Sequence, residues 1–458
     1  MVGILKQAAY LALGLFLLGC GGTGGSGGGG GGRTIGDVSA LLNVGDAASD
    51  RIVSFKVTVN SVTFKQSSGS DVPVLTLPAT VELIHRNADV EPVIIRTNFP
   101  QGSYTQVTVV LGGATATLVD SLGNLIVKTV TVTPSSVAVP LTADLSTVNS
   151  ATLNVELDLA NSIAIDGSNN VTLTPTYIVQ GVPTATVGTQ IPETGAIRDM
   201  QGSVVSVAAP NLTVYVNQAA MNFTFVTNSS TTLTGIGSVG ALVPGNLVEL
   251  DAQMQNNGSL TATKLEAVNT NADPMAVQGQ VNLVTGAPAT SFTMIVQNPI
   301  AKSTTVTVPT IGATDFNVTV GAATFELDAD EVDLSGLSFT PTFNASTLTR
   351  IQQVMAVSDT ASFTTVTATR IRLQRQAFSG QITGITTLGA QSVFTLTPPA
   401  GSAFPLLTGQ TTLTVVVQPG TELRNGTSVL VGANVRVRGL LFNNGGALVL
   451  VADRMTTP

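Results

Sequence analysis

Apolar and polar residues alternate along much of the chain and predict β-strands. Residues 53–64 place valine or phenylalanine at every second position, and the alternation changes phase at Ser61. A period of two residues is typical of a strand with one buried face, and a phase change indicates a β-bulge. Further strands are predicted over 106–111, 125–132 and 151–159. This pattern favours an all-β protein.

The strands group into successive domains. Residues 35–182 are expected to form a β-sandwich, and the proline- and glycine-containing segment 183–196 is expected to be a linker. Three β-barrel repeats are expected to follow, over 197–270, 275–375 and 376–458.

The repeats are predicted from two shared features. Gly202, Gly279 and Gly380 stand in the same opening pattern, separated by 77 and 101 residues, which suits tandem domains. Asn-Gly turns at 256–260 and 443–448 indicate a hairpin near the end of the first and third copies. The middle copy is longer and more diverged. The segments resemble an uncharacterised bacterial repeat family, which implies small barrels of OB-like character.

The beginning of the chain has the pattern of a lipoprotein signal. Residues 1–19 contain one lysine near the start and a short apolar run that ends at Leu17, Leu18 and Gly19, directly before Cys20. The run is shorter than the ~18 apolar residues that span a bilayer, although an uncleaved transmembrane anchor is the alternative. The order Leu-Leu-Gly-Cys resembles the bacterial lipobox.

That resemblance implies cleavage after Gly19 and acylation of Cys20, for example with palmitate. Two or three acyl chains anchor a protein stably, whereas one does so only marginally. Residues 20–34 are mostly glycine and form a tether of about 20 Å, because glycine-rich chains behave as flexible coils. Gly21 is not the aspartate linked to inner-membrane retention, so the outer membrane of the cell envelope is favoured, on a face that the sequence does not define.

A second resemblance covers residues 35–182. The segments 42–48, 102–108 and 157–162, followed by Leu-Thr-Pro at 173–175, are similar to envelope lipoprotein domains of the unknown-function family numbered four-three-eight-two. The resemblance implies a prealbumin-like sandwich and no established activity.

Composition narrows the functional classes. The chain has 458 residues, of which 43% are hydrophobic and 10% charged, and it has no tryptophan. The net charge of −8 argues against nucleic acid as a partner. Cys20 is the one cysteine, so a lipidated mature chain would contain no disulfide. His85 is the one histidine, which excludes most histidine-based metal and proton-transfer sites.

The densest acidic segment is a candidate for metal binding. It contains Glu326, Asp328, Asp330, Glu331 and Asp333, and alternate acids on a strand share a face. Calcium requires six to eight oxygen ligands, and Asp328, Asp330 and Asp333 are its weak candidates. The spacing is not that of an EF-hand, so a solvated acidic edge is the preferred interpretation.

Arginines recur at strand spacing in the last two repeats. They are Arg370, Arg372, Arg375, Arg436 and Arg438. OB-like barrels bind single-stranded nucleic acid through basic grooves interleaved with aromatic residues, and aromatic residues are nearly absent from these strands. We therefore interpret the arginines as guards against edge-to-edge pairing on outer strands.

Two further patterns are weighed and set aside. Residues 235–240 match the glycine fingerprint of dinucleotide-binding proteins, but Pro244 and Gly245 prevent the helix that the motif requires, so a loop is expected. His85 ends a strand-like run and is expected to be solvated rather than catalytic.

The sequence therefore predicts a lipid-anchored, non-enzymatic envelope protein without a cofactor. Its expected role is structural or adhesive, through contacts of the sandwich and barrels with an unknown protein or polymer. A lipoprotein that captures polysaccharide or calcium is one alternative, and a hydrolase that relies on His85 is another.

Overall fold

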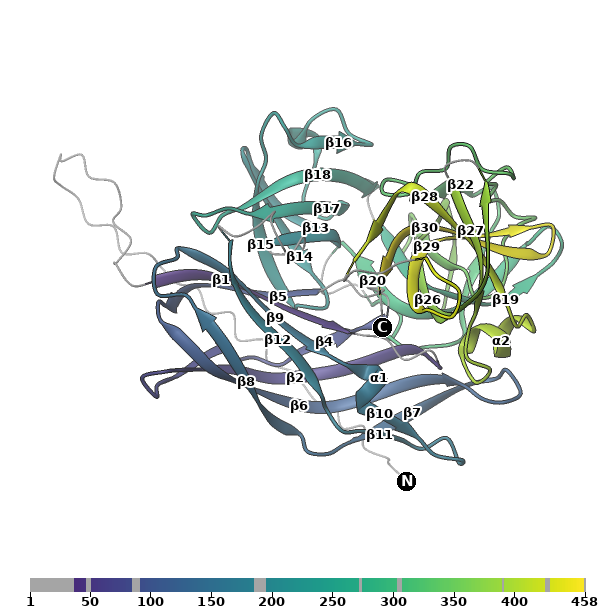
Figure 1. Ribbon diagram of the computed structural model, residues 1–458. Coiled ribbons are helices and arrows are strands. Elements are labelled where there is room, and N and C mark those ends of the chain that lie inside the picture. Colours follow the sequence, from purple (N-terminus) through teal and green to yellow (C-terminus); the bar gives the residue numbers. More distant parts are fainter. Residues whose placement is uncertain are drawn as a thin grey trace, which may run out of the picture. The chain divides into compact units, whose positions relative to one another are not determined.

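The computed structural model is built almost entirely of β-strands, which confirms the predicted all-β class (Figure 1). The structure describes residues 37–46, 51–84, 91–184, 195–271, 274–302, 307–388, 391–424 and 429–456. All of them belong to one unit that spans 36–458.

The first described domain consists of two sheets packed face to face (Figure 1). One sheet has the order β12-β9-β1-β5, in which β1 and β9 are parallel and the other neighbours are antiparallel. Its strands are β1 (Asp37–Asp46), β5 (Glu91–Pro100), β9 (Ser150–Leu157) and β12 (Tyr177–Pro183).

The second sheet has the order β10-β11-β7-β6-β2-β3, with β4 paired to β2 and β8 paired to β6. Its strands are β2 (Ile52–Gln66), β3 (Asp71–Leu75), β4 (Ala79–Glu82), β6 (Ser103–Val119), β7 (Leu125–Val132), β8 (Ser136–Asp144), β10 (Ile163–Ile165) and β11 (Val171–Leu173). The register of β2 against β6 shifts between Val59 and Ser61, where the sequence predicts a bulge.

Apolar residues from both sheets fill the core of this sandwich. Phe64, Phe99 and Tyr104 are each at most 1% exposed and contact one another within this core. The rings of Phe99 and Tyr104 stack at a centroid distance of 4.7 Å, and Phe64 meets Phe99 edge-on at 5.8 Å. Burial of such large rings is the main source of stability for a domain without disulfides.

A third sheet follows, with the order β15-β14-β13-β17-β18-β16. Its strands are β13 (Ala196–Ala208), β14 (Asn211–Val216), β15 (Met221–Val226), β16 (Thr232–Thr234), β17 (Leu247–Met254) and β18 (Leu260–Asn269). β15 also pairs in parallel with β18, so the pairing runs in a closed cycle through five strands. The predicted Asn-Gly hairpin joins β17 to β18.

The fourth sheet has the order β22-β25-β23-β19-β20-β21-β24. Its strands are β19 (Met275–Thr285), β20 (Ser291–Ala301), β21 (Phe316–Thr319), β22 (Thr324–Leu327), β23 (Gln353–Ser358), β24 (Thr365–Thr367) and β25 (Arg370–Leu373).

The last strands form a closed barrel in the order β26-β27-β28-β30-β29 (Figure 1, yellow end of the chain). They are β26 (Gln376–Leu388), β27 (Gln391–Thr397), β28 (Leu413–Leu423), β29 (Asn434–Asn444) and β30 (Ala447–Thr456). The predicted hairpin at 443–448 joins β29 to β30.

The three repeated glycines occupy corresponding places. Gly202 lies in β13, Gly279 in β19 and Gly380 in β26, the first strand of each of these sheets along the chain. In each case the register with the next strand shifts two residues further on. A Cβ atom at each glycine would lie too close to a facing carbonyl oxygen, at 2.4 Å from Tyr215, 2.0 Å from Ile295 and 2.7 Å from Thr397 respectively. A side chain is therefore excluded at these bends.

The described α-helices are short. They are α1 (Leu159–Ser162) and α2 (Ala403–Thr408), and η3 (Val239–Ala241) is a single 3₁₀ turn. None of the described helices is both long and apolar enough to cross a bilayer. The glycine fingerprint at 235–240 has bends at 235 and 237 and ends in η3, so it lies in an irregular connection rather than at the start of an α-helix.

Candidate functional site

Charged side chains from the third sheet, the fourth sheet and the closed barrel meet in a largely buried group, which we call the ionic cluster. Its cationic members are Arg198, Lys264, Arg372, Arg375 and Arg438. Its carboxylates are Asp199, Glu249, Glu266, Asp328, Asp330, Glu331 and Asp453. The cluster therefore connects segments that are far apart in the sequence.

Arg372 on β25 is at the centre of the cluster and is 6% exposed. Its Nη1 donates to Glu266 Oε1 on β18 at 2.7 Å, and its Nη2 donates to Asp328 Oδ1 at 3.0 Å. Glu249 Oε1 on β17 lies 3.8 Å from Nη1. Burial alone would lower the pKa of Arg372, but the surrounding carboxylates raise it above its usual value. The guanidinium therefore stays charged in the interior.

Arg375 extends the network toward the barrel. Its Nη2 donates to Asp199 Oδ2 at 2.6 Å, and its Nη1 lies 2.5 Å from Glu331 Oε2. The same Glu331 oxygen accepts from Arg438 Nη2 at 2.8 Å, and Arg438 Nε donates to Asp453 Oδ2 at 2.8 Å. Glu331 thus bridges Arg438 on β29 to Arg375 in the short connection between β25 and β26.

Glu249 is a carboxylate of the cluster with one described hydrogen bond. It is 1% exposed, and its Oε2 accepts from Gln201 Nε2 at 2.9 Å. Its Oε1 accepts no hydrogen bond within the described part of the chain. Burial raises the pKa of Glu249 to about 8, because Arg372 offsets only part of the desolvation and Asp328 adds negative charge. The neutral form therefore predominates at pH 7.

Asp251, on the same strand, lies beside the cluster. Its Oδ1 accepts from the backbone N–H of Asp199 at 2.8 Å. Asp199 has a φ of 50°, a left-handed conformation that is uncommon for a residue other than glycine. Burial and the Asp199 carboxylate raise the pKa of Asp251 to about 6. Two neighbouring carboxyl groups on β17 thus titrate above the ordinary range.

A carboxyl group with a raised pKa is often catalytic, but it must then be within reach of a substrate. Glu249 is closed off from solvent: Gln201 on β13 donates to it, and its neighbours Glu266 on β18 and Arg372 on β25 are bonded to each other. The arrangement suits the binding of a proton and the joining of segments.

The interpretation of the arginines as guards on outer strands is wrong for four of the five. Arg372, Arg375, Arg436 and Arg438 are between 4% and 8% exposed, so they do not protect an edge from solvent-side pairing. Arg370 is more exposed and forms an ion pair with Glu326 at 3.5 Å. The physical reason, for Arg372, Arg375 and Arg438, is that carboxylates from other segments neutralise their buried guanidinium groups.

The acidic segment is only partly the solvated edge that the sequence suggests. Asp328 is 1% exposed and pairs with arginines, whereas the side chain of Asp330 is 49% exposed. Asp333 is exposed and accepts from the backbone N–H of Ser335 at 2.9 Å. Across the described ranges, no three acidic, histidine or cysteine side chains gather as ligands for a metal ion.

Sequence reasoning missed the partners on the third sheet. Asp199, Glu249, Asp251 and Glu266 were not singled out. One signal could have found Glu249: it stands within Leu-Val-Glu-Leu, where both faces of β17 are buried. A charged residue in a strand without polar alternation needs a partner elsewhere in the chain.

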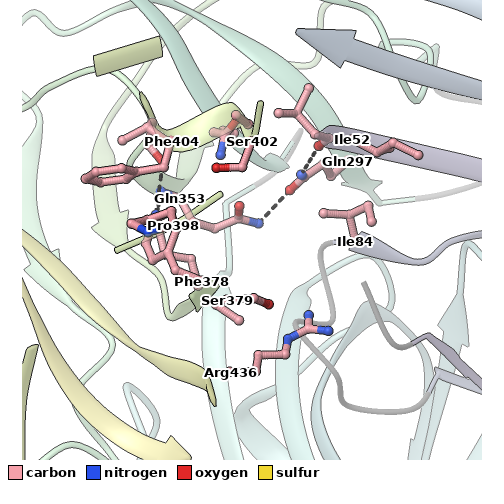
Figure 2. Close-up of a pocket in the computed structure, with 16 residues that line it drawn as sticks. Ile52, Ile84, Gln297, Gln353, Phe378, Ser379, Pro398, Ser402, Phe404 and Arg436 are labelled. Atoms are coloured by element: carbon pink, nitrogen blue, oxygen red, sulfur yellow. Dashed lines mark hydrogen bonds between the residues drawn. The ribbon is translucent and has the colours of Figure 1, made fainter. Parts of the chain in front are cut away.

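A small polar cavity lies apart from the ionic cluster (Figure 2). Its volume is about 60 Å³, and four glutamines line it together with apolar residues such as Ile52 and Phe404. Figure 2 shows the side-chain amides of Gln353 and Gln297 joined by a hydrogen bond of 2.6 Å. Ser402 Oγ is buried without a hydrogen-bond partner in the described structure. The space suits a few ordered waters, which need roughly 10–15 Å³ each.

The remaining candidates lie outside the described residues. Leu17, Leu18, Gly19 and Cys20 belong to the segment before 37, and His85 belongs to the range 85–90. Their predicted roles stay predictions.

Comparison with known proteins supports two domain assignments. Residues 38–175 match the family model described as Domain of unknown function (DUF4382), in agreement with the resemblance seen in the sequence. Residues 201–266 match a second model, Domain of unknown function (DUF5666), within the first expected repeat. A search of curated proteins gives no match.

Two solved structures show limited similarity. The structure described as drosophila Unr CSD456 is 11% identical, covers 56% of this chain and 95% of its own, and has a TM-score of 0.13. A multidomain protein with nucleic acid binding domains from Streptococcus pneumoniae TIGR4 is 12% identical, with coverages of 56% and 72% and a TM-score of 0.12. At these scores neither structure carries an argument about function.

Proposed function

We propose that the protein is a non-enzymatic lipoprotein of the bacterial cell envelope, anchored through acylated Cys20. The observation that carries this proposal is the run Leu17-Leu18-Gly19-Cys20 between a short apolar segment and a glycine-rich tether. Signal peptidase cleavage before Cys20 would leave the acylated residue at the new N-terminus. The tether then holds the β-domains away from the lipid headgroups.

The β-domains act in this proposal as a structural or adhesive surface toward a protein or polymer. In this proposal three copies of one repeat follow the sandwich, although the middle copy forms an open sheet, and the corresponding positions of Gly202, Gly279 and Gly380 in their first strands support the repeat. The ionic cluster supports the same role, because it stiffens the connections among the repeats. Rigid arrays of modules present large surfaces to a partner at little cost in conformational entropy.

Cell fractionation tests the anchor. Wild type should be in the outer-membrane fraction and should incorporate labelled palmitate, whereas Cys20→Ala should incorporate none and leave that fraction. Gly21→Asp is the matched control, because it keeps the acylation site and should move the protein to the inner membrane. Equal membrane association of wild type and Cys20→Ala would refute the proposal. Digestion of intact cells with protease then identifies the membrane face.

A further inference from the structure

Among the charged side chains that the structure describes in the ionic cluster, seven are carboxylates and five are cationic. Asp251 adds another acidic group beside them. A buried carboxylate that lacks a full set of donors is costly when ionised, because desolvation is not repaid by hydrogen bonds. One member of the cluster therefore has reason to remain neutral.

Glu249 has polar and charged neighbours on several elements. From β13 it faces the amide of Gln201 and the carboxylate of Asp199, and from β18 it faces Glu266. From β25 it faces Arg372, and from the segment after β22 it faces Asp328.

Arg372 is committed to other partners, with hydrogen bonds of 2.7 Å to Glu266 and 3.0 Å to Asp328. It lies farther from Glu249, at 3.8 Å. Lys264 on β18 is also committed, to Glu266 and Asp330. A proton on Glu249 would remove the negative charge that these cations leave uncompensated.

We propose that the ionic cluster is a proton-operated lock: Glu249 keeps a proton while β17 and β18 are docked against β25, and loss of that proton loosens the docking. When Glu249 ionises, it repels Glu266 and Asp328 in a buried site. Hydration of the charge then requires the strands to separate far enough to admit water.

An apolar contact between the third and fourth sheets is expected to persist when the docking loosens. Leu247 and Val268 of the third sheet pack with Ala276, Ile300 and Met355 of the fourth, and all five are at most 1% exposed. Because this contact does not titrate, the sheets are expected to stay attached while their docking becomes less rigid.

The sign of the pH dependence follows from the direction of the shift. The pKa of Glu249 in the folded chain is about 8, raised above the usual 4.5. The protonated Glu249 side chain contributes its full stabilisation at pH values below 4.5, the usual pKa that applies to the unfolded chain, and this contribution is lost as the pH rises toward 8. In this window the unfolding constant is expected to rise by up to about tenfold per pH unit for one proton.

Carbon-13 labelling of glutamate tests the protonation directly. The chain contains nine glutamates, so the carboxyl spectrum is simple, and the Glu249→Gln variant assigns the signal of Glu249. In the full chain, we expect this signal to titrate near pH 8. If the variant does not fold, amide correlations to the labelled side chain give the assignment in wild type. A midpoint between pH 4 and 5 would overturn the proposal.

Spin labels test the loosening. They are placed at exposed Asn256, at the tip of the β17–β18 hairpin, and at exposed Thr365 on β24. The distance distribution should be narrow at pH 6 and broad at pH 9 in wild type, and should stay narrow at both pH values in Glu249→Gln.

The matched control is Glu422→Gln on β28, outside the cluster, where Arg424 and Arg454 lower the pKa against the effect of burial. The distance distribution of this variant should broaden between pH 6 and pH 9, as that of wild type does. A wild-type distance distribution that stays narrow while Glu249 ionises would contradict the proposal. The same broadening in Glu249→Gln would also contradict it.

Discussion

Replacement of Arg372 by methionine tests whether the ionic cluster holds the sheets together. Methionine keeps most of the length of the side chain and removes the charge and the hydrogen bonds to Glu266 and Asp328. Both carboxylates, with Glu249, would then remain in a site that is almost closed to water. We expect a strong loss of stability around β17, β18 and β25.

The magnitude follows from the burial of the pairs. Removal of one partner from a buried ion pair costs about 3–5 kcal/mol, because the other charge is left uncompensated. The side chain of Arg372 is 7% exposed and that of Asp328 is 2% exposed, so this range applies. Since about 1.4 kcal/mol corresponds to a factor of ten, amide protection on these strands should fall by roughly two to four orders of magnitude.

Hydrogen exchange followed by mass spectrometry measures this protection strand by strand. Glu326→Gln is the matched control, because it removes only the 3.5 Å ion pair with Arg370 on the same strand, whose side chains are 30% and 34% exposed, and it leaves the hydrogen bond from Arg370 Nη2 to the carbonyl oxygen of Val268 in place. A half-exposed pair of this kind contributes less than about 1 kcal/mol. Equal effects of the two substitutions, or a loss below about 1 kcal/mol in Arg372→Met, would refute the reasoning.

Two further substitutions probe the barrel and the repeated strand. In urea unfolding followed by circular dichroism, Glu422→Gln should lower the free energy of unfolding at pH 7 by less than about 1 kcal/mol. Because the pKa of Glu422 is lowered in the folded chain, the difference from wild type should vanish as the pH falls below 4. Gly279→Ala should cost about 1–3 kcal/mol or more in the same assay, since its Cβ would lie 2.0 Å from the carbonyl oxygen of Ile295, while Gly237→Ala, with nothing within 4 Å, should cost much less.

Local patterns in the sequence predict the strands and hairpins well. The alternation over 125–132 coincides with β7, and the Asn-Gly turns at 256–260 and 443–448 join the strands that they are expected to join. These features depend on residues close together in the chain, where side-chain period and turn geometry act directly. The change of phase at Ser61 likewise marks a real irregularity in β2.

The ionic cluster depends on contacts that local patterns do not contain. Arg372 and Glu266 are 106 residues apart, and the period of two shows only that Arg370 and Arg372 share a face of their strand. The same rule places Asp328 and Asp330 on one face of their segment, without showing that the two faces meet. Both groups therefore looked like solvated edges, and only the pairing of distant strands reveals that each neutralises the other.

The mass of the N-terminal peptide of the mature protein tests the central claim most directly. The account predicts a chain that begins at Cys20 and carries at least two acyl chains, followed by the glycine-rich tether. A mature chain that begins at Met1, with an unmodified thiol at Cys20, would contradict it.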